Sequence, residues 1–350
     1  MLKNLFIREN LKRKGVSLMK GTHTHKKSFM VFLVCVSLIL LGLNPAHSVP
    51  VVAPPYNASY TITDLGSVTG LPTPYGGLTL LAGDTNTLLI GGNANNASGD
   101  LYSIGVTRDA GNHITGFSGT ATYYAEAAYN DGGVVYGPGD VLFLARWPVN
   151  ELGQTKPGSS ITDKVINLSA LGVGGGGPGG LNFVPSGYPG AGDLKLVTWS
   201  AGEWYTIGIS PDGSGTYDVT SVTYETTIVG GPEGFIYVPP GSPLFTDYDS
   251  LLVSEWSEGN IAAYSLDGDG NPIPGSRVDF ITGLSGAEGA FIDPLTGDFL
   301  FSTFGGGDRV FLVEGFAPPQ PPPPVPEPST LLLLGSGLLG LAGIRKRFKT

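Results

Sequence analysis

The feature that most constrains the fold is a Gly-centred element that recurs five times along the chain. The copies read YGGLTLLAG, DGGVVYGPG, PGGLNFVPS, PEGFIYVPP and AEGAFIDPL, and each opens a short apolar run. The last Gly of each opening pair falls at positions 77, 133, 180, 234 and 289, so the spacings are 56, 47, 54 and 55 residues. A near-constant period of this length indicates a repeat architecture.

Four apolar runs can be followed in most copies of the repeat. Second runs such as NTLLIGG, third runs such as EWYTIGISPD and fourth runs such as ATYYAEA follow one another, with turn residues between them. Short alternating runs separated by turns are typical of antiparallel strands. The copy at Gly133 has a poor third run, and we expect a loop from Asn150 to Ser160 in its place.

Four strands in each unit of about 50 residues predict a blade of a β-propeller. The fifth unit ends after its third strand at Phe316, and the run ASYTITDLGS, from Ala58, could supply the missing strand. Because such pairing removes open sheet edges, we expect an all-β propeller of five blades closed by an N-terminal strand. Three alternatives stay open: six blades if residues 150–169 hold a partial unit, a two-sheet sandwich of jelly-roll or lectin type, and a β-solenoid.

The first 48 residues have the pattern of a secretion signal peptide. Eight Lys or Arg precede an apolar stretch from Phe29 to Leu43, and Ala46 and Ser48 offer small residues at the cleavage positions. We expect cleavage after Ser48, whether translation starts at Met1 or at Met19. The alternative is an N-terminal anchor that is retained.

Charge and residue counts exclude several classes of function for the exported part. Residues 49–325 contain 27 Asp or Glu and 7 Lys or Arg, a net charge of −20 that repels nucleic acid and anionic membranes. The single cysteine, Cys35, lies in the leader, so the body has neither a disulfide nor a thiol nucleophile. His113 is the one histidine of the body, which excludes a zinc site built from several histidines.

The body, residues 49–316, is followed by a Pro-rich linker, residues 317–325, and by a tail of three parts, residues 326–350. In order, the tail consists of Pro326, Glu327 and Pro328, an apolar run from Ser329 to Ile344, and a basic end with Arg345, Lys346 and Arg347. As a helix the apolar run would rise about 24 Å, a little less than the thickness of a bilayer core. The basic residues predict that the C-terminus stays in the cytoplasm, so everything before Pro326 lies outside.

This tail resembles the PEP-CTERM sorting signal of Gram-negative bacteria, which exosortase-type membrane enzymes recognise. The resemblance rests on the Pro-Glu-Pro, apolar and basic parts together. It implies export across the inner membrane, transient anchoring by a C-terminal transmembrane helix, processing near Pro328, and a final place in the cell envelope or outside the cell. It also implies a setting in exopolysaccharide or biofilm material. A plain anchor that is never cut is the alternative.

Two acidic residues mark the expected mouth of the propeller channel. The first strand of each blade lines the channel, and the residues just before the repeated Gly are Gly76, Gly132, Gly179, Glu233 and Glu288, with Asp131 beside one of them. Carboxylates that meet there could hold Ca²⁺ or another hard cation. An acidic residue before such a Gly also loosely resembles lactonase-like propellers. The alternative is that Glu233 and Glu288 are solvated and bind nothing.

Three other patterns favour structural roles. Asp267, Asp269 and Asn271 match the first ligands of a calcium loop, but Pro272 and Val278 stand where Gly and Glu are required, so we expect a hairpin turn. The Gly-rich run from residue 172 to 180 lacks the Lys and the helix of a phosphate-binding loop. At equivalent ends of second strands stand Trp147, Trp199 and Trp256, for which we expect packing between blades, with sugar stacking as the alternative.

We therefore expect a non-enzymatic exported protein that acts as a binding or structural module and needs no cofactor. Its expected partners are the secretion machinery, an exosortase-type membrane enzyme and extracellular polysaccharide, and nucleic acid is excluded. The alternative is a metal-dependent hydrolase or lyase whose metal is held by Glu233 and Glu288 at the channel mouth. A sugar-binding module is a third hypothesis.

Overall fold

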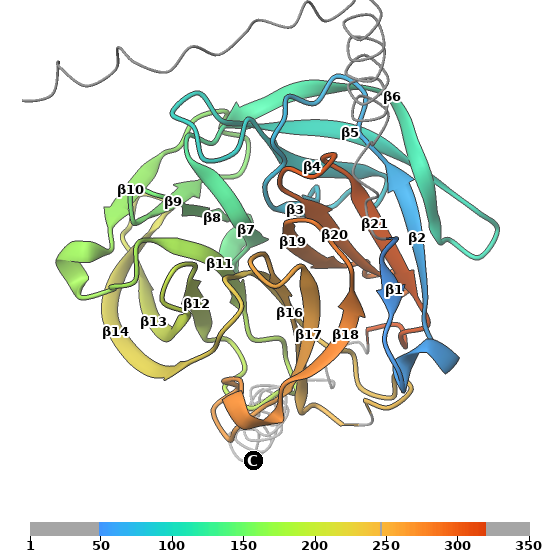
Figure 1. The fold of residues 1–350 in the computed structure, drawn as a ribbon. Coiled ribbons are helices and arrows are strands. Elements are labelled where there is room, and N and C mark those ends of the chain that lie inside the picture. Colours follow the sequence, from blue (N-terminus) through green and yellow to red (C-terminus); the bar gives the residue numbers. More distant parts are fainter. Residues whose placement is uncertain (1–48, 246, 320–350) are drawn as a thin grey trace, which may run out of the picture. The chain divides into compact units, whose positions relative to one another are not determined.

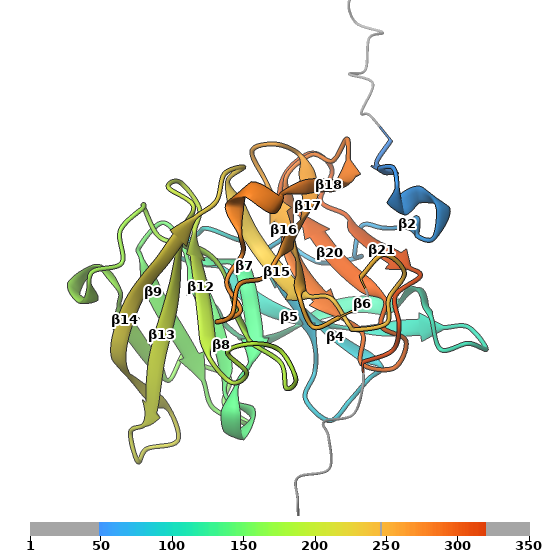
Figure 2. The ribbon, with the colours of Figure 1, turned by 90° about the horizontal axis from the view of Figure 1, so that it is seen from below.

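The computed structural model describes residues 49–245 and 247–319. In this part of the chain, five antiparallel sheets are arranged around a common axis, with one strand of each nearest the centre (Figure 1). Seen from the side, β12, β13 and β14 lie next to one another in a single blade (Figure 2). The fold is therefore the five-bladed β-propeller that the repeat predicts.

The first three blades follow the order of the chain, from the centre outward. Blade 1 contains β3 (Leu78–Leu80), β4 (Thr87–Gly92), β5 (Asp100–Arg108) and β6 (Ile114–Glu126). Blade 2 contains β7 (Asn130–Tyr136), β8 (Leu142–Arg146), β9 (Glu151–Thr155) and β10 (Lys164–Asn167). Blade 3 contains β11 (Pro178–Phe183), β12 (Leu194–Thr198), β13 (Glu203–Pro211) and β14 (Tyr217–Thr227).

The last two blades recruit strands from the N-terminal end of the body. Blade 4 contains β15 (Pro232–Tyr237), β16 (Ser250–Glu255), β17 (Asn260–Ser265), β18 (Val278–Thr282) and the short β1 (Val51–Val52). Blade 5 contains β19 (Ala287–Ile292), β20 (Phe299–Thr303), β21 (Val310–Glu314) and β2 (Thr61–Gly66). Single 3₁₀ turns occur at η1 (Tyr56–Ala58), η2 (Pro138–Asp140), η3 (Ser169–Leu171) and η4 (Pro274–Ser276).

Strand β2 closes the ring as the sequence predicts. It pairs antiparallel with β21, with Thr61 opposite Glu314 and Asp64 opposite Phe311. The Arg309 guanidinium also pairs with the Asp64 carboxylate at 2.6 Å. Since β2 completes the fourth position of blade 5, the two ends of the body are fastened to each other and the edge of β21 is covered. The pairing of β1 with β18 is an addition that the sequence did not indicate.

Two expectations for blade 2 are corrected. The region expected to be a loop contains β9, which pairs with β8 and β10, so the third strand is present although its sequence is polar. The same region completes blade 2 and holds no sixth blade, and the sandwich and solenoid alternatives are also wrong. Strand β9 could be missed because its residues are Glu-Leu-Gly-Gln-Thr, of which Leu152 alone is a large apolar residue.

Apolar side chains fill the spaces between neighbouring blades. Between blades 5 and 1, Leu300 and Leu312 pack in one buried cluster with Leu78, Ile90 and Ile104. Comparable clusters join the other blades. Burial of apolar area in these layers is the main favourable contribution to the fold.

The repeated Gly residues lie where the inner strands meet at the axis. A Cβ atom added to Gly180 would stand 2.1 Å from the Glu233 carbonyl oxygen, and one added to Gly289 would stand 2.7 Å from the Gly77 Cα. At Gly132 the nearest atom would be the Gly234 nitrogen, at 2.7 Å. Only Gly permits such close approach of backbones, which explains the recurring element.

The expected signal peptide, residues 1–48, and the expected transmembrane helix of the tail lie outside the described residues. No helix within residues 49–245 and 247–319 has the length and apolarity needed to cross a membrane. Of the expected linker, residues 317–319 are described, and Ala317 follows Phe316, which is buried in the core between blades 4 and 5.

Candidate metal centre

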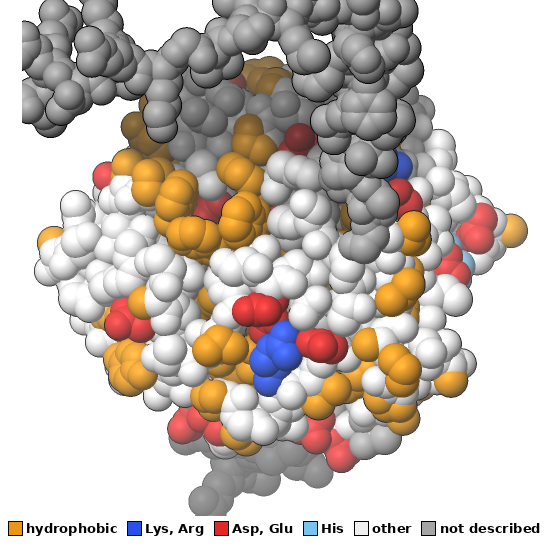
Figure 3. Space-filling model, in the orientation of Figure 1, with side chains coloured by type: hydrophobic (Ala, Val, Ile, Leu, Met, Phe, Trp, Pro, Cys, Tyr) orange, Lys and Arg blue, Asp and Glu red, His pale blue; other side chains and the backbone are white. Residues whose placement is uncertain are grey.

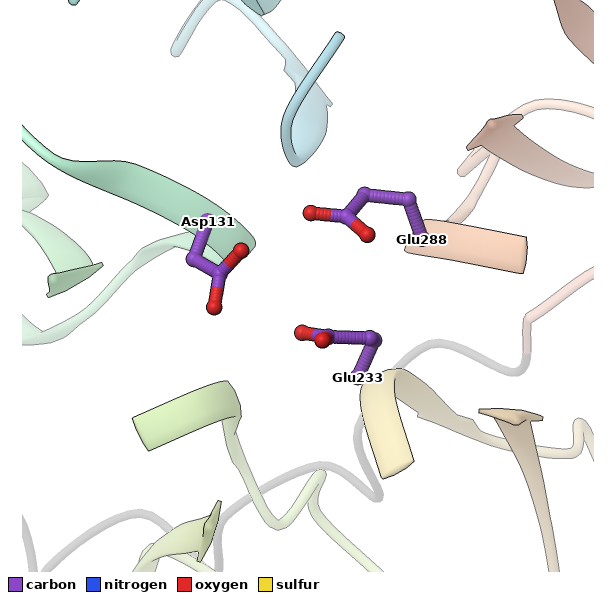
Figure 4. Close-up of side chains that lie close together, drawn as sticks. All are labelled: Asp131, Glu233 and Glu288. Carbon is purple, nitrogen blue, oxygen red and sulfur yellow. The ribbon is translucent and has the colours of Figure 1, made fainter. Parts of the chain in front are cut away.

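Asp131, Glu233 and Glu288, hereafter the carboxylate trio, converge at the axis of the propeller. Each is the second residue of an inner strand, in β7, β15 and β19 respectively. Their carboxyl groups point toward one another from three different blades (Figure 4). One carboxylate oxygen from each residue lies within 4.8 Å of the others.

A bulge explains why Asp131 joins the two glutamates. In β15, the three steps from Pro232 to Phe235 face two steps of β16, so one residue is extra. In β7, the four steps from Asn130 to Val134 face two steps of β8, so two residues are extra. The additional residue brings Asp131, and not Gly132, to the position that corresponds to Glu233. Bulges of this kind re-aim side chains near functional sites.

The trio is removed from solvent. The exposed fractions of Asp131, Glu233 and Glu288 are 1%, 4% and 1%. The alternative that the two glutamates are solvated is therefore wrong, because backbones and side chains enclose them. Burial of an ionised carboxylate costs several kcal/mol unless it is paired.

The trio lacks the partners that other buried carboxylates have. Both oxygens of Asp131, one of Glu233 and one of Glu288 are buried and meet no hydrogen-bond partner in the described part of the chain. Elsewhere in the same residues, buried carboxylates are paired with cationic side chains. The pairs are Glu255 with Arg277 at 2.5 Å, Asp293 with Arg108 at 2.5 Å, and Asp298 with His113 at 2.8 Å.

Between residues 49 and 319, no positive side chain is left to neutralise the trio. Each Lys and Arg between residues 49 and 319 makes an ion pair with some other carboxylate. These cations are Arg108, Arg146, Lys156, Lys164, Lys195, Arg277 and Arg309. Acidic side chains are spread over the face drawn in Figure 3, and basic ones are few. Any compensating charge must therefore come as protons or as a bound cation.

The environment raises the pKa of all three carboxyl groups. Burial lifts the pKa of Asp131 to about 7, and smaller opposing effects of the Glu288, Asn95 and Glu233 side chains reduce the rise only in part. Burial, together with the charge of Asp131, holds the pKa of Glu233 well above its usual value. Burial and the charges of Glu233 and Asp131 do the same for Glu288. Near neutral pH, an unliganded trio therefore retains protons.

Asn95 lies beside the trio and was missed by sequence reasoning. Its backbone has a left-handed φ of 64°, its N–H donates to the Asn130 carbonyl oxygen at 2.9 Å, and its own side-chain oxygen is buried without a partner. The signal in the sequence is the run Asn-Ala-Asn-Asn at residues 93–96. Blade 1 has Asn93 where the four other blades have Trp or Phe.

Those aromatic residues form an arc on the trio's end of the propeller. The rings of Trp147 and Trp199 are 5.5 Å apart, those of Trp199 and Trp256 are 5.8 Å apart, and Phe304 follows at 6.4 Å from Trp256. All three contacts are edge-to-face, and all four rings are half-buried. The expected packing between blades is therefore observed, while sugar stacking stays a prediction.

The remaining patterns have structural roles. Asp267 accepts hydrogen bonds from the backbone N–H groups of Asp269 and Asn271, at 2.9 and 2.8 Å, and so forms the expected turn. The expected inter-blade loop precedes β11, in which Pro178 is the first residue. His113 stands in the turn between β5 and β6, where its Nδ1 atom contacts Asp298.

Comparison with known families identifies the tail. Residues 324–347 match a family described as the PEP-CTERM protein-sorting motif. The chain carries a PEP-CTERM sorting motif. The matched stretch includes Pro326, Glu327 and Pro328 and the basic residues Arg345, Lys346 and Arg347, all of which lie outside the described residues. The motif implies processing by exosortase, a membrane enzyme, and hence export, anchoring at the membrane during sorting, and a place in the cell envelope.

Several solved structures resemble part of this chain at low identity. A protein of the Carbohydrate-Active Enzymes Family AA12 from Trichoderma reesei has 11% identity and a TM-score of 0.48, over 78% of this chain and 99% of that chain. The pyranose dehydrogenase PQQ domain from Coprinopsis cinerea has 11% identity and a TM-score of 0.39, over 78% and 98%. A streptogramin B lyase has 10% identity and a TM-score of 0.38, over 73% and 98%. A comparison with curated protein sequences gives no significant match. No activity is inferred from these likenesses.

Proposed function

We propose that this PEP-CTERM protein is an exported, non-enzymatic envelope module whose propeller is held together at its axis by a divalent cation, with Ca²⁺ as the leading candidate. The observation that carries the proposal is the carboxylate trio, three buried acids with unpartnered oxygens and no cationic side chain. The cation would replace the protons that the trio otherwise retains.

The spacing of the trio fits one ion. Ca²⁺ binds oxygens at about 2.3–2.6 Å, so two oxygens on opposite sides of one ion are about 4.6–5.2 Å apart. The trio's oxygens lie within that separation. Carboxylate ligands from three blades would connect blades 2, 4 and 5 through one ion. The ion would thus stabilise the propeller at the axis, where the blades converge.

The burial of the trio favours a structural cation over a catalytic one. A catalytic metal keeps an open position for water or substrate. The three carboxylates are almost completely enclosed. A metal-dependent hydrolase or lyase is the alternative function, and it requires that the Asn93–Asn96 loop or another cover moves to admit a substrate.

The position of the protein supports a role in the cell envelope or its surrounding matrix. Proteins sorted by this kind of tail are placed outside the inner membrane, where Ca²⁺ is available. Nucleic acid, which the net charge of −20 on residues 49–325 would repel, is not the expected partner there. We propose extracellular polysaccharide as the setting, with the rigid propeller acting by binding or by structure. The half-buried aromatic arc is the candidate contact surface for sugar rings.

The test is metal content and calorimetry on the exported protein. We expect one Ca²⁺ per chain after purification in Ca²⁺, and loss of that ion in the double variant Glu233→Gln, Glu288→Gln. The matched control is Glu258→Gln, because Glu258 is an exposed glutamate in a turn. Failure of the wild-type chain to bind Ca²⁺, Mg²⁺ or Zn²⁺ at pH 8 would overturn the proposal. Turnover of a glycan or lactone that needs the bound ion would favour the enzymatic alternative.

A further inference from the structure

A cavity of about 600 Å³ lies at the opposite end of the inner strands from the carboxylate trio. Strand β7 shows the separation, because Asp131 is near its start and Tyr136, which lines the cavity, is its last residue. Because of the bulge, the stretch from Asn130 to Tyr136 faces four steps of β8, which span about 13 Å. The close-packed Gly residues at the axis lie between the two sites, so the cavity is a site of its own.

The wall of the cavity is apolar and aromatic. Tyr136, Tyr188, Tyr237, Tyr248 and Phe291 contribute rings, and five prolines are among the other lining residues. The rings are fixed in place, since Tyr237 donates its hydroxyl to the Gly270 carbonyl oxygen at 3.0 Å and Tyr188 donates to the Val238 carbonyl oxygen. Tyr188 also packs edge-to-face against Tyr237 at 5.3 Å and against Tyr248 at 4.9 Å.

The one charged residue in this wall is already engaged. The Asp84 carboxylate accepts hydrogen bonds from the Thr87 hydroxyl at 2.7 Å and from the Asn86 backbone N–H at 2.8 Å. The cavity therefore offers flat aromatic faces and little charge. Such surfaces recognise extended proline-rich segments, because proline rings stack on aromatic side chains and the polyproline II helix is already ordered before binding.

The chain itself delivers a proline-rich segment to this cavity. The Ala317 N–H donates to the Ser242 hydroxyl oxygen at 2.9 Å, which fixes the chain as it leaves blade 5. Two residues later Pro319 forms part of the cavity wall. The residues that follow read Gln-Pro-Pro-Pro-Pro-Val-Pro-Glu-Pro, positions 320–328. The proline-rich segment therefore begins at the wall of the cavity.

We propose that the cavity binds the protein's own linker, residues 320–325, as a polyproline II segment. Because the linker is tethered at Pro319, its effective concentration is in the millimolar range or above, which favours binding within one chain over binding between chains. At about 3.1 Å per residue, the sorting motif at Glu327 would be held within about 25 Å of Pro319. A folded propeller would thus set where the motif stands when it is processed.

The test uses the full chain and a synthetic peptide of residues 320–328. In the variant with Gly-Ser-Gly-Ser in place of Pro321–Pro324, the cavity is vacated, and we expect the peptide to bind at least tenfold more tightly than it binds to the wild type. Adding Tyr248→Ala or Ser186→Trp to that variant should abolish peptide binding, since both residues line the cavity and neither is fully buried. The matched control is Tyr224→Ala, because Tyr224 is 55% exposed on the outer strand β14.

Three outcomes would overturn the proposal. The first is that the Gly-Ser variant binds the peptide no better than the wild type. The second is that Tyr224→Ala weakens binding as much as Tyr248→Ala, which would show a non-specific effect. The third is a dimer that forms in the wild type and is lost in the Gly-Ser variant, because the linker would then occupy a second copy. Circular dichroism and thermal melting establish that each variant is folded.

Discussion

The most informative prediction concerns the pH dependence of stability and its reversal by Ca²⁺. An acid whose pKa is raised in the folded protein binds more protons folded than unfolded, so stability falls as pH rises from its ordinary pKa through the raised one. For Asp131 the interval runs from 3.8 to about 7. At about 1.4 kcal/mol per pKa unit, this one group contributes a loss of about 4 kcal/mol.

The two glutamates extend the loss to higher pH, since their pKa values are also raised. The carboxylate oxygens lie within 4.8 Å of one another, so each pair of ionised carboxylates repels by at least about 3.5 kcal/mol at an effective dielectric constant of about 20. Glu288 takes part in two of the three pairs, so Glu288→Gln removes most of the repulsion. In EDTA we therefore expect the melting temperature of the wild type to fall by about 10 °C between pH 5 and pH 8.

Calcium should reverse a large part of this fall in the wild type and not in the variant. At a free Ca²⁺ concentration of 100 times Kd, binding adds about 2.7 kcal/mol of stability. Glu288→Gln should show a smaller fall with pH in EDTA and little response to Ca²⁺, whereas Glu258→Gln should behave as the wild type. Differential scanning calorimetry measures both effects. A wild-type melting temperature that is the same at pH 5 and pH 8 in EDTA, or unaffected by Ca²⁺ at pH 8, would refute the reasoning.

Three further predictions concern the fold. Gly180→Ala places a Cβ atom against the Glu233 carbonyl oxygen and should destabilise the propeller by about 3 kcal/mol in urea unfolding. The control Gly275→Ala, where nothing lies within 4 Å of the added Cβ atom, should change stability little. Equal effects of the two variants would contradict the axial packing. Deletion of residues 49–66 removes β1 and β2, exposes the edge of β21 and should give aggregated protein in size-exclusion chromatography; a monodisperse, stable product would contradict closure by β2. Because the contact with Asp298 raises the pKa of His113, His113→Gln should lower stability at pH 5.5 and much less at pH 8.5; a penalty that is independent of pH would show that this contact does not depend on the imidazolium charge.

Much of the fold could be predicted from local patterns. The recurring Gly residues identified the blades because each inner strand needs a residue without a Cβ atom where five backbones approach one axis. Gly180 and Gly289 are two such residues. The run from Ala58 was expected to be the closing strand, because a unit with three strands leaves an edge that only a distant segment can cover. The polar strand β9 was missed, because its hydrogen bonds to β8 and β10 hold residues that have no apolar pattern of their own.

The candidate site was predicted less completely. The positions of Glu233 and Glu288 before a repeated Gly placed them at the axis, but Asp131 was assigned to a neighbouring position, because the second extra residue in β7 is visible only in the pairing with β8. Burial was missed as well. A sequence shows neither how far loops such as Asn93–Asn96 cover an axial site nor which carboxylates the seven basic residues of the body neutralise.

The sequence alone determined the repeat, the acidic body and the sorting tail, because each depends on residues that are close together or on simple counts. Only the tertiary structure decided that three acids from blades 2, 4 and 5 share one enclosed space, with no counter-charge from the residues it describes. It also decided that aromatic rings from several blades surround a cavity beside the linker. The physical reason is that both sites consist of residues far apart in the chain. Their distances, burial and mutual charge arise only when the ring of blades closes.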